Sequence, residues 1–302
     1  MITPILTLLN CIMLHSLLPT MGVLRFLGTD AKAFLQGQLS NDIKNLQDNQ
    51  ACYASYNTPQ GRVTANMIVV AHANELLMIA ACDLLEILHK RLSMFVLRSQ
   101  VKIEMANNLG VAFNLPDNIS PFTMPDEPLL THFAYEKQVS GCLKLLLPHG
   151  GSLLLGEKSL LPEYNQTAEK EWQAFEIQSG FAWITQATSN LFVAQMLNLH
   201  RLGGIHFKKG CYVGQEVIAR SQYIGQVKRG LAVYQSPALL NAGDEILDND
   251  NNVVGNVVNV AGNLNLCVIK HAAEKEPLHV GDAALLWIKS FIVNSDQKQT
   301  RR

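Results

Sequence analysis

The last third of the chain restricts its fold more than any other stretch does. From Val227 onward, short apolar runs alternate with turns rich in aspartate, asparagine and glycine, as in GLAVYQ, GDEILDNDNNVVGNVVNVA, LNLCVIKHAA and VGDAALLWI. Short strands separated by such turns are typical of a small all-β barrel. We therefore predict a β-barrel over residues 228–290, followed by a polar tail over 291–302.

The residues before the barrel mix helix and strand signals, which indicates an α+β body. A proline-rich stretch at 117–128 divides this body into two predicted parts, 21–116 and 129–227, and an N-terminal segment precedes them at 1–20. The expected elements are a strand from Gly22, a helix from Asp30, a hairpin over 52–81, a helix over 83–95, a hairpin that turns at 149–151 and a helix over 168–180.

The composition excludes several classes of protein. The chain has 302 residues, 48% of them hydrophobic and 16% charged, which is typical of a folded protein with more than one lobe. A net charge of -1 gives no electrostatic footprint for direct binding of nucleic acid. The six cysteines are scattered without a C-x-x-C pair, which favours reduced thiols in the cytoplasm.

The first residues of the chain are apolar and carry no charge before Arg25. They lack the basic start and the small-residue cleavage site of a secretory signal. Asn10, His15 and Pro19 also interrupt the run well before the roughly 20 apolar residues that span a bilayer. We predict a cytoplasmic N-terminal segment and no membrane partner.

One cysteine lies in an unusual setting, the stretch KKGCYVGQE at 208–216. Two lysines precede Cys211, glycines stand on both sides of it, and a helix is expected to begin at Gly214. Nearby cations and a helix N-terminus favour a reactive or metal-ligating thiolate. The alternative is a small buried residue in a glycine turn. Because no other cysteine stands at a ligand spacing and His200 and His206 form no metal motif, we predict no permanent metal.

This stretch also carries a family resemblance. Residues 209–216, KGCYVGQE, match the K-G-C-Y-x-G-Q-E signature of the YgfZ family, and GTDAKAFLQGQLSND, SYNTPQGRV and FVAQMLNLHRLGGIHFKKGCY follow the order of that family. The family contains bacterial folate-binding proteins linked to tRNA modification, with mitochondrial relatives in iron–sulfur protein maturation. The resemblance implies the fold of the glycine cleavage T-protein, an aminomethyltransferase: two α+β domains around a central folate channel, plus a C-terminal β-barrel.

The resemblance also implies site residues. Trp172 matches a tryptophan that contacts folate, although by itself it could simply be a core residue of an amphipathic helix. Gln178 stands where the family has a glutamate that addresses the pterin, and Met21 stands where it has a second tryptophan. Cys211 would be the functional thiol, and the signature residues expected to support it are Lys209, Gly210, Tyr212, Gly214, Gln215, Glu216 and Arg220.

The position of the T-protein's acidic group is different here, because Ala65 and Asn66 stand where acids would be. Neither side chain takes up a proton near neutral pH, which argues against an aminomethyltransferase. We therefore expect a folate-binding accessory protein, with tetrahydrofolate or a derivative as its cofactor. Its expected partners are iron–sulfur enzymes or assembly proteins, and through them it would support tRNA modification. The alternatives are a one-carbon transferase that uses Cys211 and a scaffold that has lost folate binding.

Overall fold

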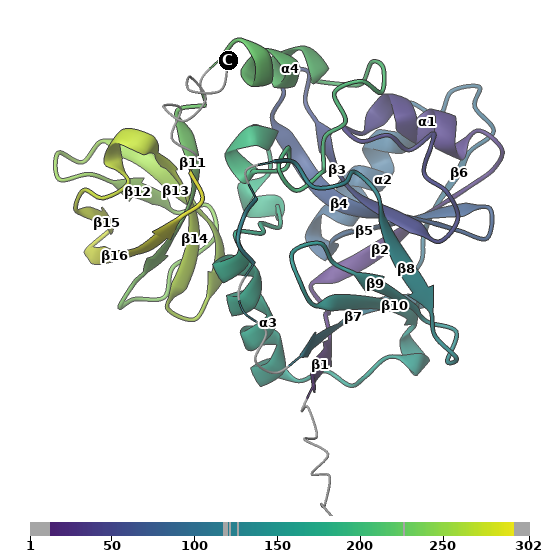
Figure 1. Cartoon of the computed structure of the whole chain (residues 1–302), viewed down its shortest axis with the longest axis horizontal. Helices are drawn as coiled ribbons and strands as arrows, with labels where there is room; N and C mark the ends of the chain where they lie inside the picture. Colours follow the sequence, from purple (N-terminus) through teal and green to yellow (C-terminus); the bar gives the residue numbers. More distant parts are fainter. Residues whose placement is uncertain (1–12, 117–119, 121, 126, 226, 293–302) are drawn as a thin grey trace, which may run out of the picture.

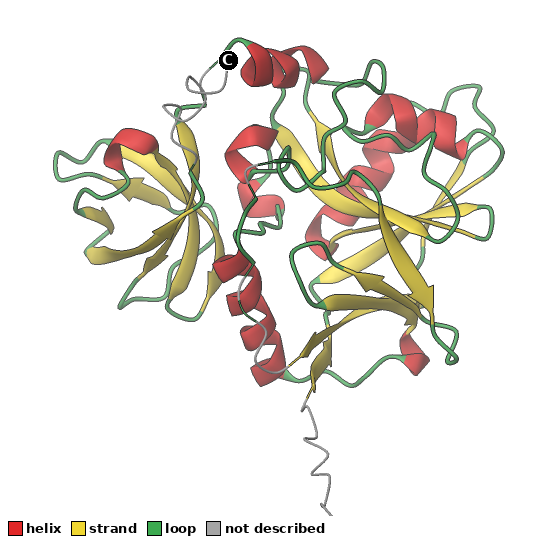
Figure 2. Ribbon diagram, in the orientation of Figure 1, coloured by secondary structure: helices red, strands yellow, loops and turns green. Residues whose placement is uncertain are grey.

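The computed structural model describes residues 13–292, except 117–119, 121, 126 and 226. Most of the predicted N-terminal segment, nearly all of the polar tail and part of the proline-rich stretch therefore lie outside the described residues. The four α-helices of the described part are α1 (Ala31–Gln38), α2 (Leu85–Ser93), α3 (Gln166–Ser179) and α4 (Gln215–Tyr223), as Figures 1 and 2 show.

Ten strands of the body form one antiparallel sheet with the order β1-β7-β10-β9-β8-β3-β4-β5-β2-β6. The two predicted parts of the body share this sheet, because β8 pairs with β3 through Gln50 and Ala134. The strands are β1 (Met13–Leu17), β2 (Met21–Leu27), β3 (Gln50–Asn57), β4 (Val63–His72), β5 (Glu75–Ala81), β6 (Lys102–Met105), β7 (Leu109–Pro116), β8 (Phe133–Lys137), β9 (Leu143–Leu146) and β10 (Ser152–Glu157).

The sequence patterns account for these elements. Both α1 and α2 bury apolar residues at helical spacing, including Phe34 and Leu35 in α1 and Leu88 and Leu92 in α2. The two predicted hairpins are present, and the first continues into a third strand, β5, after a turn at residues 73–74. None of the helices in the described part of the chain is long and apolar enough to cross a membrane.

The C-terminal region is a closed six-stranded barrel with the order β11-β14-β13-β12-β15-β16, which confirms the predicted β-barrel. Helix α3 packs against β1 of the body and against β13 and β14 of the barrel, so it lies between the two (Figure 1). The barrel strands are β11 (Arg229–Gln235), β12 (Glu245–Leu247), β13 (Val253–Ala261), β14 (Leu264–Lys270), β15 (Leu278–Val280) and β16 (Ala283–Ser290).

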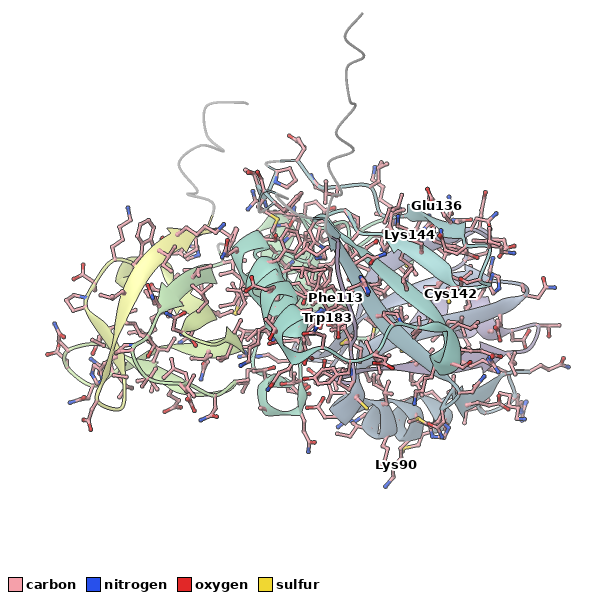
Figure 3. All side chains as sticks on the ribbon, turned by 90° about the horizontal axis from the view of Figure 1, so that it is seen from below. Lys90, Phe113, Glu136, Cys142, Lys144 and Trp183 are labelled. Atoms are coloured by element: carbon pink, nitrogen blue, oxygen red, sulfur yellow. The ribbon has the colours of Figure 1, made fainter. Side chains whose placement is uncertain are left out.

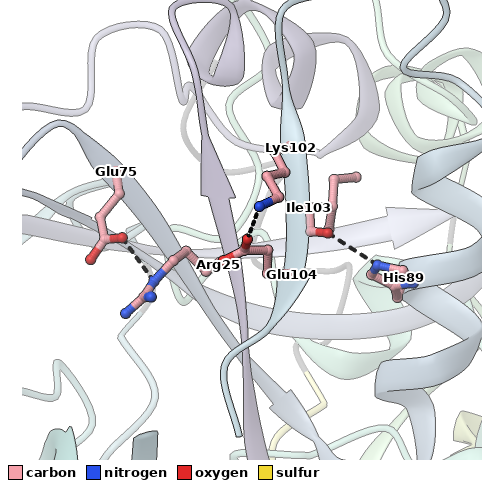
Figure 4. A network of polar contacts seen from close by, with 6 residues as sticks. All are labelled: Arg25, Glu75, His89, Lys102, Ile103 and Glu104. Atoms are coloured by element: carbon pink, nitrogen blue, oxygen red, sulfur yellow. Dashed lines mark hydrogen bonds and ion pairs between the residues drawn. The ribbon is translucent and has the colours of Figure 1, made fainter. Parts of the chain in front are cut away.

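The edge strand β6 is covered instead of being left open for another chain. Figure 4 shows His89 of α2 donating from Nε2 to the carbonyl oxygen of Ile103 at 3.1 Å. Charged side chains lie beside it on the same end of the sheet, where Arg25 pairs with Glu75 at 2.9 Å. A covering helix and charged residues are two ways in which proteins protect a sheet edge from aggregation.

Candidate functional site

A cavity of about 140 Å³ lies where the body, α3 and the barrel meet. An apolar cavity of about 150 Å³ is large enough to bind benzene, so this cavity can hold roughly one ring system of a ligand. We call it the pocket. Its lining comes from the N-terminal strands, α3, the segment 181–185 and β13: Leu18, Thr20, Met21, Ala81, Trp172, Gln173, Glu176, Ile177, Phe181, Trp183, Thr185, Asn259 and Val260.

Two of the predicted folate contacts, Trp172 and Met21, line this pocket together. Trp172 is only 1% exposed, and its indole stacks on Phe113 with ring centroids 5.0 Å apart. Gly151, in the left-handed region at φ 68°, lets the β9–β10 turn approach the indole, because a Cβ there would lie 2.8 Å from it. Trp172 is therefore both a core residue and a wall of the pocket.

The carboxyl group of the pocket comes from Glu176, and Gln178 is not among the lining residues. Glu176 lies one helical turn after Trp172, on the same face of α3, and its Oε1 accepts a hydrogen bond from Trp183 Nε1 at 2.9 Å. Burial raises the pKa of Glu176 to about 8, although the indole N–H groups of Trp183 and Trp172 oppose the rise. At neutral pH this carboxyl is mostly protonated, so it can donate one hydrogen bond and accept others.

The segment 181–185, which carries Trp183, runs between two asparagines. On one side, Asn66 donates to the carbonyl oxygen of Ala182 at 2.7 Å and accepts from the amide of Ile184 at 2.8 Å. On the other side, Asn259 accepts from the Trp183 amide at 3.0 Å and donates to its carbonyl at 2.9 Å. The side chain at position 66 therefore holds the backbone, and an ionised carboxylate could not make the donating bond.

The signature lies at a different place, in the loop 208–214 that we call the thiol loop. Cys211 is exposed, and Gly210 before it has φ 96° with no other atoms near the position of a Cβ. Gly214, at φ 80°, directly precedes α4 and packs on the β3–β4 turn, where a Cβ would lie 2.5 Å from the carbonyl oxygen of Thr58. Two of the quoted motifs therefore meet, and the second glycine is required by a close backbone approach.

The ammonium group of Lys209 binds the C-terminal end of α1. Its Nζ donates to the carbonyl oxygens of Gln36 and, at 2.5 Å, of Leu39 at the C-terminal end of α1, and it lies 4.8 Å from the ring centroid of Tyr212. A cation at this end of a helix is favourable because of the unpaired carbonyl groups and the helix dipole. Burial nevertheless lowers the pKa of Lys209 to about 8.

The other predicted supporting residues shape the loop or lie on the surface. Tyr212 is buried, and its amide donates to Gln215 Oε1 at 3.3 Å, which closes the turn before α4. Glu216 and Arg220 are exposed on α4. None of the signature residues lines the pocket, so the structure brings the thiol loop and the predicted folate contacts into two separate sites. Within the described residues, no group of three or more histidine, cysteine, aspartate or glutamate side chains could hold a metal ion.

Of the 13 residues that line the pocket, only Met21 and Trp172 were predicted from the sequence, and the hydrogen-bonded residues Glu176, Trp183 and Asn259 were not. The spacing of Trp172 and Glu176 could have indicated the first, because residues four apart share a helix face whereas residues six apart do not. Local sequence gives no comparable signal for the other two. Figure 3 shows Trp183 and Phe113 in the middle of the molecule, whereas Lys90 projects from its outer edge.

Comparison with known proteins defines the class first. The chain resembles the aminomethyltransferase T of the glycine cleavage system from Bartonella henselae with a TM-score of 0.64 over 92% of this chain and 85% of that one, at 14% sequence identity. This likeness shows the fold: the protein has the T-protein architecture, which confirms the predicted fold class.

Sequence relatives identify the family. No family model matches the chain. The tRNA-modifying protein YgfZ of Hamiltonella defensa is 30% identical over 230 residues, which cover 71% of this chain and 68% of that protein. The YgfZ protein of Colwellia psychrerythraea is 28% identical over 226 residues, 70% of this chain and 68% of that one. The chain belongs to the YgfZ family.

Proposed function

We propose that this protein is a cytoplasmic folate-binding accessory protein that supports iron–sulfur cluster assembly or repair in iron–sulfur enzymes, and through them tRNA modification. The observation that carries the proposal is the pocket, where the buried Glu176 lies between Trp172 and Trp183 in the fold of an aminomethyltransferase. The name of the relatives, tRNA-modifying protein, supports the proposed link to tRNA modification.

The chemistry of the pocket suits the pterin end of tetrahydrofolate. The indole of Trp172 offers an apolar surface to a flat heteroaromatic ring, and Met21 covers another part of the wall. A protonated Glu176 can pair with a ring that presents a donor and an acceptor side by side. The pocket holds about one ring system, so the rest of the cofactor would extend through its opening. Gln178 would then act only from outside the lining.

Cys211 would carry the part of the proposed function that concerns iron–sulfur clusters. Its thiol is exposed in a loop that leads directly into α4. Cys82 is also exposed but lies outside the signature, whereas Cys52, Cys142 and Cys267 are buried. A stable iron–sulfur cluster normally takes four cysteine ligands, so one exposed thiol suits transient, shared ligation or a covalent carrier role with a partner protein. The partner would be an iron–sulfur enzyme or an assembly protein that approaches the thiol loop.

The two alternative functions have less support. A one-carbon transferase that uses Cys211 requires the thiol beside the bound cofactor, yet Cys211 is not among the residues that line the pocket. This chain also has no acid at position 66, where the amide of Asn66 makes two hydrogen bonds with the backbone. A scaffold without folate would leave a buried carboxyl in an aromatic cavity with no evident purpose.

Isothermal titration calorimetry with tetrahydrofolate tests the proposal. We expect the wild-type protein to bind, and Glu176→Ala to bind at least about tenfold more weakly, because a hydrogen bond to a buried group of the site is lost. The matched control is Glu171→Ala, which removes an exposed carboxyl of the same helix that is not among the lining residues. If wild type does not bind tetrahydrofolate at millimolar concentration, the pocket is not a folate site and only the scaffold remains.

A further inference from the structure

The C-terminal barrel contributes part of the pocket, and it does so at an irregularity in its own sheet. The pairing of β13 with β14 shifts register between Val257 and Asn259, as in a β-bulge. Val257 packs in the core inside the barrel, and the next residue, Val258, packs in the larger core that the barrel shares with the body. Asn259 follows and lines the pocket. Bulges redirect a side chain in this way and are frequent beside functional sites.

The redirected amide of Asn259 holds one residue of the opposite wall. It accepts a hydrogen bond from the backbone N–H of Trp183 and donates one to the carbonyl oxygen of the same residue, at 3.0 and 2.9 Å. Both polar groups of Trp183's backbone are therefore fixed by one side chain from the barrel. Asn66 of β4 fixes the residues on either side, Ala182 and Ile184.

The indole of Trp183 continues this chain of contacts to the polar group of the pocket. Its Nε1 donates to Glu176 Oε1 at 2.9 Å, and its ring packs edge-on against Phe181 with centroids 5.1 Å apart. Glu176 is the only titratable side chain among the lining residues, and the buried Tyr53 is the nearby group that its charge affects. The orientation of the one carboxyl in the pocket thus depends on a side chain 83 positions away in sequence, in another domain.

We propose that Asn259 is a positioning residue through which the docked barrel sets the geometry of the pocket, by holding Trp183 so that its indole orients Glu176. A barrel that moves away from α3 would release Trp183 and disorder the pocket. The proposal rests on the proposed function only for the identity of the ligand. The linkage between the barrel and Glu176 exists whether or not the ligand is a folate.

The first test uses the ligand-free, full-length protein. Asn259→Ala leaves the backbone groups of Trp183 without their partner, so we expect faster hydrogen exchange at the amides of residues 182–184. The substitution also loosens the hydrogen bond from Trp183 to Glu176, which favours the ionised form of this carboxyl. The pKa of Glu176 in the folded protein should therefore rise, and the loss of stability that follows its ionisation should occur at higher pH. The matched control is Asn256→Ala, a residue of the same strand that bonds Gly243 instead.

The second test measures tetrahydrofolate affinity. We expect Asn259→Ala to weaken binding about tenfold, the size of effect that follows from losing one well-placed hydrogen bond, and Asn256→Ala to leave it unchanged. If wild type binds no tetrahydrofolate, the proposed function fails, and the exchange and pH measurements still decide the role of Asn259. If Asn259→Ala behaves like Asn256→Ala in exchange and in the pH midpoint, Asn259 does not position the pocket and the inference is wrong.

Discussion

Replacing Glu176 with glutamine should remove a pH dependence of stability that this one buried carboxyl creates. The pKa of Glu176 rises from 4.5 to about 8 in the folded protein because burial disfavours the charged form. A group whose pKa is raised on folding stabilises the protein fully below its unfolded pKa, and this contribution is lost as pH rises through the folded pKa. The wild-type protein should therefore lose stability through Glu176 over the neutral range.

The magnitude follows from the same values. Each pH unit between the two pKa values is worth about 1.4 kcal/mol, so raising the pH from about 6.5 to about 8 should cost wild type roughly 1–2 kcal/mol through this group. Glu176→Gln cannot ionise, and its amide oxygen can still accept from Trp183 Nε1. Other titrating groups are common to both proteins, so the difference between them isolates Glu176.

Urea unfolding followed by tryptophan fluorescence at these two pH values measures the effect. Wild type should become less stable relative to Glu176→Gln as the pH rises. Glu169→Gln serves as a control for removing a carboxyl from the same helix. If wild type and Glu176→Gln change in parallel over this range, Glu176 is ionised in the folded protein and the account of the pocket as a neutral hydrogen-bonding site is refuted.

Three further predictions concern the thiol loop and the core. Gly214→Ala should destabilise the protein by at least about 1 kcal/mol more than Gly210→Ala in urea unfolding, since both strain the backbone but only the first meets another chain segment. Lys209→Met should cost about 1–2 kcal/mol because two carbonyl oxygens lose their donor, whereas Lys208→Met, which replaces an exposed lysine, should cost little. Burial lowers the pKa of His149 from 6.5 to about 3, so wild type should lose about 1–2 kcal/mol relative to His149→Phe as pH falls from about 6.5 to about 5.

Each of these has a contrary outcome that is easy to see. An equal loss in the free energy of unfolding for the two glycine substitutions would mean that the β3–β4 turn does not contact Gly214 closely. A neutral Lys209→Met would mean that water replaces the ammonium at the end of α1. A constant difference between wild type and His149→Phe would mean that His149 is not held neutral against Phe181 and Tyr53.

Local patterns predicted much of the fold, and the reasons are physical. The barrel was predictable because short strands and their turns each leave a signal of a few residues. The start of α4 was predictable from Gly214, which adopts a left-handed conformation directly before the helix. The continuous sheet across both parts of the body was not, because the pairing of β8 with β3 joins residues more than 80 positions apart.

In the site, too, sequence motifs predicted some residues, whereas contacts between distant segments were not predicted. Trp172 and Met21 were predicted from the family motif, and both line the pocket. Gln178 was predicted from the same motif but is not among the lining residues, whereas Glu176, which was not predicted, is one of them. Lys209 was predicted to support the thiol, and that role stays a prediction. The contact of its ammonium group with the end of α1 could not be predicted, because it joins residues 170 positions apart. Trp183 and Asn259 could not be found from sequence because their contact joins two domains.

Genetic complementation tests the central claim most directly. A bacterial strain lacking its own YgfZ protein would receive this gene as wild type or as Cys211→Ser, with protein levels matched, and iron–sulfur enzyme activity and tRNA modification would be measured. The account predicts that wild type restores both and that Cys211→Ser restores neither, although the exposed position of Cys211 leaves the variant folded. Equal rescue by the two proteins would contradict the account, because the thiol would then have no function.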